Sequence, residues 1–350
     1  MDDRHALMTA IVANPDEDTP RLVFADWLQE HGDEQDRARA EPIRLQIEYD
    51  PLKVGSAPRN KLQRRAVAIQ KKHAKHWLGP LWPIIQKGWG DELDGVGLFR
   101  RGLLFWWYVA PKQFLQKSHQ KAVREWFPLV GINDLTMHTR ATQCAGVAAS
   151  PALAWAPEFA WDEGKIDDAG LSALAASPHF TRLSTFSVDQ NVVTDKGLRE
   201  FADTATMPNL RTFKLWSGNK AKYTAAGMLA LVSSKRFPNL CDLELECGQP
   251  NSLKWAELFA DPRVKRLKRL MIGWKGDIAA AVRSPNLSGL EELGGNDVTF
   301  TEADADALLA NPAFAGLKRF HLESLDVKLT PVIKKKLRER FGDGLSLAFA

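Results

Sequence analysis

Seven prolines recur through the last two-thirds of the chain, and their spacing limits the possible folds more than any single motif. They lie 27, 30, 30, 24, 23 and 27 residues apart, at Pro151, Pro178, Pro208, Pro238, Pro262, Pro285 and Pro312. Each follows an Ala/Leu-rich stretch and precedes a short run with leucine-like residues at its first, fourth and often sixth positions, as in Leu240-x-x-Leu243-x-Leu245. Self-similarity at a nearly constant period indicates a repeat of one strand and one helix.

The two halves of each repeat carry different local signals. Period-two alternation in the leucine-containing runs is typical of a strand with one buried face. The half that follows begins with residues whose side chains can cap a helix, namely Asp167, Thr194, Thr224, Thr301 and Thr330. We therefore expect an α/β solenoid with a curved parallel sheet and outer helices. The glycine-rich unit after Leu290 predicts an irregular strand, and Leu345–Phe349 a closing strand.

This pattern resembles leucine-rich repeats of the longer, ribonuclease-inhibitor-like subtype, over roughly residues 128–350. The family usually places Asn or Cys just after each strand. Here only Asn191 fills that position well, since Gly164, Gly218, Gly248 and Lys275 occupy it elsewhere. The resemblance implies loosened turns at those repeats.

The first fifty residues carry a second resemblance. The runs Asn14–Phe24, Ala25–Gly32 and Arg39–Gln46 are similar to the bacterial repeat-companion domain, a short module often found ahead of leucine-rich repeats. We therefore expect a helical module at 1–50, a basic helix with a glycine-rich turn and the N-terminal cap of the solenoid at 51–127, and repeats with a C-terminal cap at 128–350. The resemblance implies no activity.

Local signals in the first module predict helices. Thr19 can cap a helix, Pro20 suits its first position, and Gly32 suits a left-handed exit. An apolar stripe of Leu22, Val23, Trp27 and Leu28 is expected to face the core.

The net charge of +4 conceals an asymmetry along the chain. Residues 1–50 hold thirteen acidic and five basic side chains, whereas residues 51–90 hold nine basic and no acidic ones. A basic helix near Arg59–Trp77 could bind nucleic-acid phosphates through Arg59, Lys61, Arg64, Arg65, Lys71, Lys72 and Lys75. We favour the other interpretation, in which this helix faces the acidic module and solvent.

Motifs for catalysis, metals and cofactors are weak in this chain. His73 and His76 could supply two metal ligands, but no carboxylate or cysteine accompanies them. The glycines of residues 88–97 follow neither the dinucleotide-binding nor the P-loop order. We therefore expect a non-enzymatic protein without a metal or cofactor.

Targeting signals and cysteine usage bear on location. The charged start and the lack of a long apolar stretch predict neither a signal peptide nor a membrane span. The three cysteines (Cys144, Cys241 and Cys247) suit reduced thiols in the cytoplasm.

The inner, concave side of the predicted arc is the candidate binding surface, because strand residues between the buried leucines point out from it. We expect partner-binding residues at Lys214, Trp216, Glu244, Glu246, Arg269, Met271, Trp274, His321 and Glu323. Trp216 and Trp274 are candidate hot spots, although both could instead pack against neighbouring repeats.

Three functional hypotheses follow. The first, which we favour, is a protein-interaction scaffold that binds a protein partner on the concave face. The second is a nucleic-acid-associated protein that uses residues 59–87. The third is a regulatory or substrate-presenting subunit of a partner enzyme.

Overall fold

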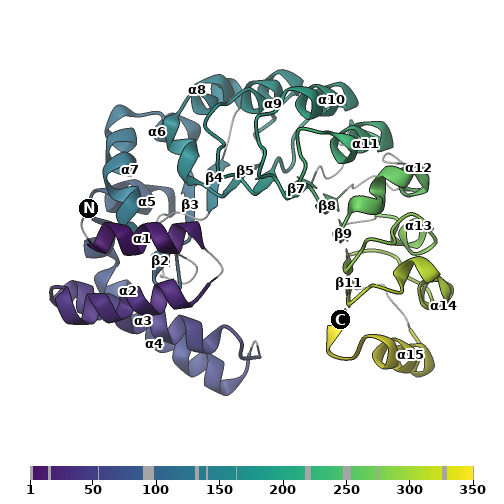
Figure 1. Cartoon of the computed structure of the whole chain (residues 1–350), viewed down its shortest axis with the longest axis horizontal. Coiled ribbons are helices and arrows are strands. Elements are labelled where there is room, and N and C mark those ends of the chain that lie inside the picture. Colours follow the sequence, from purple (N-terminus) through teal and green to yellow (C-terminus); the bar gives the residue numbers. More distant parts are fainter. Residues whose placement is uncertain are drawn as a thin grey trace. The chain divides into compact units, whose positions relative to one another are not determined.

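The computed structural model describes residues 3–14, 17–53, 55–89, 98–130, 134–138, 141–162, 164–216, 222–246, 254–273, 276–324 and 329–349. The chain forms two compact units, shown as a ribbon in Figure 1. The N-terminal unit comprises Met1–His138 and Ser150–Glu158, and the repeat unit comprises Thr139–Ala149 and Phe159–Ala350. In the part of the chain that the structure describes, no helix combines the length and apolar character needed to cross a bilayer.

The N-terminal unit is mainly helical. Its helices are α1 (Asp3–Ala13), α2 (Thr19–His31), α3 (Glu34–Tyr49), α4 (Ala57–Leu78), α5 (Trp82–Trp89), α6 (Pro111–Phe114) and α7 (Lys117–Val130). Its strands are the antiparallel pair β1 (Phe99–Arg100) and β2 (Leu103–Leu104), and the parallel pair β3 (Trp106–Val109) and β4 (Asp134–His138). The predicted basic helix is confirmed as α4.

One apolar core joins the first helices to the β1–β2 hairpin. Met8, Phe24, Leu28, Ile43 and Leu103 are buried together in it. The predicted stripe of α2 is therefore partly wrong: Leu28 faces the core, but Leu22 and Val23 are 37% and 47% exposed. Phe24 and Ala25 take the buried positions instead, because they lie one turn before Leu28 on the same face.

The predicted ends of α2 differ from those observed. Asp18 occupies the cap position and Thr19 is the first helical residue, with Pro20 in the first turn as expected. Gly32 leaves the helix in an extended conformation (φ −76°, ψ 163°), not a left-handed one. A side chain there would collide with Leu28 and Asp36, so close packing explains this glycine better than backbone conformation does.

The repeat unit alternates strands and helices. Its strands are β5 (Glu158–Asp162), β6 (Thr185–Ser187), β7 (Thr212–Trp216), β8 (Asp242–Glu246), β9 (Arg269–Gly273), β10 (Glu292–Asn296), β11 (Arg319–Ser324) and β12 (Leu345–Phe349). Its helices are α8 (Cys144–Ala148), α9 (Asp168–Ala175), α10 (Asp195–Thr204), α11 (Ala225–Ser233), α12 (Trp255–Ala260), α13 (Ile278–Val282), α14 (Glu302–Ala310) and α15 (Pro331–Phe341).

These eight strands lie side by side in chain order in a parallel sheet, and the helices lie on its outer side (Figure 1). The arrangement is an α/β repeat array consistent with a curved solenoid, as predicted. The closing strand β12 is confirmed. The irregular strand expected in the glycine-rich unit is not found: β10 pairs in register with both β9 and β11.

Register rows build the core between sheet and helices. One row of adjacent strands contains Phe186, Phe213, Leu243, Leu270, Leu293 and Phe320, all fully buried. Because side chains alternate along a strand, the same register brings the intervening positions together on the other face.

Neighbouring helices are also joined through their first turns. All five predicted capping side chains accept hydrogen bonds from backbone N–H groups. In addition, the first residue of one helix binds the capping residue of the next helix. The Asp168 carboxylate accepts a hydrogen bond from the backbone N–H of Thr194 (2.8 Å), and the Asp195 carboxylate accepts one from the backbone N–H of Thr224 (2.7 Å). Repeat-to-repeat spacing is thus fixed by polar contacts as well as by the core.

Candidate functional site

The candidate site is the face of the repeat sheet opposite its helices, here called the open face. It comprises the outward side chains of β7 to β11: Thr212, Lys214, Trp216, Asp242, Glu244, Glu246, Arg269, Met271, Glu292, Arg319, His321 and Glu323. Strand alternation selects these positions, since their neighbours in sequence are the buried core residues.

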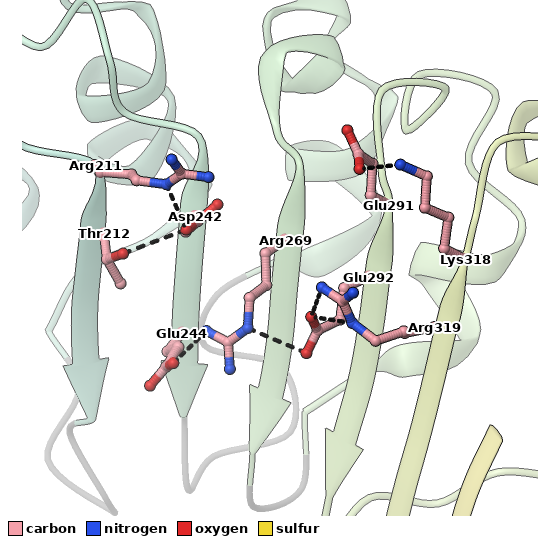
Figure 2. Close-up of polar contacts among 9 residues, drawn as sticks. All are labelled: Arg211, Thr212, Asp242, Glu244, Arg269, Glu291, Glu292, Lys318 and Arg319. Carbon is pink, nitrogen blue, oxygen red and sulfur yellow. Dashed lines mark hydrogen bonds and ion pairs between the residues drawn. The ribbon is translucent and has the colours of Figure 1, made fainter. Parts of the chain in front are cut away.

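The first row of the open face is a chain of opposite charges across adjacent strands (Figure 2). Asp242, Arg269, Glu292 and Arg319 are register partners in that order. Arg269 Nε lies 3.2 Å from Glu292 Oε1, and an Arg319 Nη lies 2.6 Å from Glu292 Oε2. Asp242 accepts hydrogen bonds from Thr212 Oγ1 (3.4 Å) and Arg211 Nε (3.3 Å).

Arg269 links the first row to the second. Its guanidinium pairs with Glu244 as well as Glu292, and Lys214 Nζ lies 3.2 Å from Glu244. The Arg269 and Glu244 side chains are 30% and 13% exposed, so these ion pairs are partly shielded from solvent. Lys214, Glu244 and Arg269 lie on one face, as the sequence predicted, but the sequence did not identify Glu292, which pairs with Arg269 and Arg319.

The contacts of Glu292 explain the pKa of its carboxyl group. Burial by itself would raise the pKa of its carboxyl group, but hydrogen bonds and charges from Arg319 and Arg269 outweigh burial and hold the pKa below its usual value. The carboxylate is therefore charged at neutral pH and holds both arginines in place.

Met271 lies at the centre of the second row. A Cβ atom on Gly294 would collide with the Met271 side chain, so the glycine of β10 leaves room for the methionine to lie across it. His321 follows on β11, with Nε2 3.8 Å from Glu323 Oε2. This part of the face combines an apolar centre with polar edges.

The last row carries the aromatic residue of the face. Trp216 is 40% exposed at the end of β7, and its register partner on β8 is Glu246. Burial raises the pKa of Glu246, with further contributions from the charges of Asp189 and Asp297. Trp274, the second predicted hot spot, lies outside the described residues.

The basic helix α4 presents its cations unevenly. Arg59 donates from Nη1 to the carbonyl oxygens of Tyr49, Asp50 and Leu52 and lies over the Tyr49 ring, so it is engaged within its own unit. Arg65 pairs with Glu41. The remaining predicted phosphate ligands, Lys61, Arg64, Lys71, Lys72 and Lys75, are exposed to solvent.

The two histidines considered as metal ligands, and two of the cysteines, contact or pack against other protein groups. His73 hydrogen-bonds to Gln35 and stacks on Trp77, while His76 lies 4.0 Å from Asp33. Among the described residues, no group of three His, Cys, Asp or Glu side chains could hold a metal ion. Burial raises the pKa of the Cys144 and Cys241 thiols to about 12 and about 11, so both are protonated and weakly nucleophilic.

Comparison with known proteins does not assign the chain to a family. No protein-family model matches the chain, and no curated protein matches it. Among solved structures, one similar chain is a structural-genomics protein from Bacteroides fragilis, with 16% sequence identity and a TM-score of 0.42. That match covers 62% of this chain and 65% of the other, so this chain spans less than two thirds of its length.

Proposed function

We propose that this protein is a non-catalytic scaffold of leucine-rich-repeat type that binds a protein partner through the open face. The observation that supports it most is the face itself: ion-paired side chains lie beside Met271, and Trp216 is exposed on the same face. An aromatic residue amid polar groups is the usual composition of a binding hot spot.

The ion pairs favour binding by limiting motion before the partner arrives. Arg269 contacts carboxylates on both neighbouring strands, and Glu292 contacts arginines on both of its neighbours. Ordering a long side chain at an interface costs about 0.5–1.5 kcal/mol, and side chains already held in place avoid much of that cost. A partner therefore meets a preformed surface.

The N-terminal unit, in this proposal, contains a repeat-companion module that accompanies the repeats. A cytoplasmic location fits the free thiols of Cys144 and Cys241. If the captured partner is an enzyme, the scaffold acts as its regulatory or substrate-presenting subunit.

The test is affinity capture with the full chain from its native cells, at low and high salt. We expect a protein partner that is retained at high salt, and Trp216→Ala should weaken it by about 2 kcal/mol. The matched control is Val332→Ala on α15, which removes an apolar side chain that is 65% exposed on a helix.

Equal retention by the Trp216→Ala and Val332→Ala variants would contradict binding on the open face. Capture of nucleic acid that is released by salt would instead favour the exposed lysines of α4, since phosphate contacts weaken steeply as salt rises.

A further inference from the structure

The N-terminal unit contains an open cavity of about 1070 Å³ that the open-face proposal does not use. It lies between the first turns of α1 and α3, the last turns of α4 and the start of α5. The lining residues used in the following argument are Arg4, Asp36, Lys72, Lys75, Trp77 and Trp82. Its size suits a small molecule, because ligand pockets are commonly about 300–1,000 Å³.

The acidic groups of the cavity are already compensated. Arg4 Nη1 lies 2.7 Å from Asp36 Oδ2, with both side chains at most 23% exposed. Asp33, which also lines the cavity, caps α3: its carboxylate accepts from the backbone N–H of Asp36 at 2.8 Å. That hydrogen bond is the main reason why the pKa of Asp33 lies below its ordinary value.

The cationic groups are not compensated in the same way. Lys72 and Lys75 line the cavity from exposed positions of α4, and neither has an ion-pair partner within the described part of the chain. The walls therefore carry an excess of positive charge.

A buried guanidinium adds to that excess from behind the wall. Arg39 is 1% exposed, donates from Nε to Gly102 O at 2.9 Å, and lies 5.8 Å over the ring of Trp77, which lines the cavity. Its Nη2 is buried without a hydrogen-bond partner. Burial lowers the pKa of Arg39 to about 9, so the group is still charged at neutral pH.

We propose that this cavity binds a small organic anion, with a carboxylate or phosphate facing Lys72 and Lys75 and an apolar or aromatic body against Trp82. An anionic group would offset the charges of Lys72 and Lys75, and it would add to the partial compensation that Asp36 gives to Arg39. The part-exposed indole of Trp82 offers a flat surface on which a planar ligand can stack, whereas Trp77 is 3% exposed and already stacks on His73.

The test is isothermal titration of the full chain with phenyl phosphate, benzoate and the neutral analogue phenol. We expect one or both anions to bind at least about tenfold more tightly than phenol, and the two anions distinguish a phosphate ligand from a carboxylate ligand. Binding of neither anion, or equal binding of phenol, overturns the proposal.

Paired variants locate the site. Lys72→Gln with Lys75→Gln should weaken anion binding about tenfold or more. Lys61→Gln with Lys71→Gln removes the same charge from exposed positions of α4 outside the cavity and should leave binding nearly unchanged. Equal losses in the two double variants would show a general effect of net charge and would overturn the cavity assignment.

Arg39→Met gives a second measurement. The substitution removes the donor to Gly102 O, so thermal stability should fall, and anion binding is measured well below the unfolding transition, where it should be weaker than in the unchanged protein. Undiminished binding in a folded Arg39→Met variant would remove Arg39 from the site. If that variant does not fold, the lysine pairs still decide the proposal.

Discussion

In the repeat unit, Asp168 and Asp195 make the same contact one repeat apart, whereas Gln46 and Arg59 in the N-terminal unit make contacts that occur once. Asp168 and Asp195 each bond the capping threonine of the next helix. Gln46 instead joins α3 to the β1–β2 hairpin: its Nε2 donates to Phe99 O at 2.8 Å and its Oε1 accepts from Gly102 N at 2.7 Å.

This difference predicts how damage is distributed. The stability of a repeat array is approximately the sum of a contribution from each repeat and one from each junction between neighbouring repeats. The loss of one repeat contact therefore weakens only one of several similar junctions. A contact made once has no equivalent nearby. We therefore expect the largest single-residue effects on stability in the N-terminal unit.

The largest expected effect is that of Gln46→Ala. The substitution leaves the buried carbonyl group of Phe99 and the buried N–H group of Gly102 without Gln46, and it should reduce the free energy of unfolding by about 3 kcal/mol. Urea unfolding measures the change. Gln29→Ala is the control, because Gln29 is exposed and, within the described part of the chain, its side chain hydrogen-bonds only to Arg44. An equal effect of both substitutions would contradict the comparison.

Arg269→Met tests the charges of the open face. Without the guanidinium, Glu244 and Glu292 lose a shared cation in a partly buried setting, and we expect a loss of about 2 kcal/mol in urea unfolding. Arg319 pairs with the same Glu292 but is 61% exposed, so Arg319→Met should cost under about 1 kcal/mol. A reversed order would show that burial does not set the strength of these pairs.

Gly227→Ala tests one repeat junction. A Cβ atom at this position would lie 2.6 Å from Asp195 Oδ1, the oxygen that accepts from the backbone N–H groups of Thr224 and Gly227. Displacing that carboxylate should cost about 1–2 kcal/mol, partly offset by the higher helix propensity of alanine. Gly316 has no atom within 4 Å of an added Cβ, so Gly316→Ala should be neutral or slightly stabilising.

Two carboxyl groups of the repeat unit should affect the pH dependence of stability with opposite signs. Burial is the main reason that the pKa of Asp189 is raised from 3.8, so its protonated form is favoured in the folded state. Its contribution to stability is present below pH 3.8 and is lost as pH rises through the folded pKa. Asp189→Asn should thus stabilise the protein at neutral pH by less than about 1 kcal/mol, with the gain fading on acidification.

Glu291 provides the opposite case. Its hydrogen bond from Lys318 is the main reason that its pKa is lowered from 4.5, so its contribution is present above pH 4.5 and is lost as pH falls through the folded pKa. Glu291→Gln should destabilise the protein slightly at neutral pH and have no effect in acid. Thermal unfolding across a pH series measures both variants, and shifts of the same sign would contradict this account.

The predictability of the two units from sequence differs for a physical reason. Leu243, Leu270 and Leu293 recur with the repeat, so each reinforces the assignment of the others. The strands and capped helices of the repeat unit follow the prediction, except that β10 is regular where an irregular strand was expected. The buried face of α2, by contrast, has to be predicted from one helix alone, because its pattern is not repeated elsewhere in the chain. Leu22 and Phe24 are both apolar, and only packing against the hairpin shows which of them is buried.

The ion pairs of the open face could not be predicted from the sequence, although the residues that form the face could. Strand alternation placed Lys214, Glu244 and Arg269 on one face. Register decides which charges meet, and register depends on the lengths of the intervening loops and helices. Arg39 is a further case: nothing in its sequence neighbourhood distinguishes this buried arginine of α3 from the exposed Arg37.

Site-specific photo-crosslinking tests the central claim most directly. A photoreactive residue is placed at position 216 on the open face and, in a second protein, at position 332 on α15, and each full chain is irradiated in native cells. The account predicts a protein adduct at position 216 and none at position 332. An adduct at position 332 alone, or no adduct at either position from a chain that still captures its partner, would contradict binding through the open face.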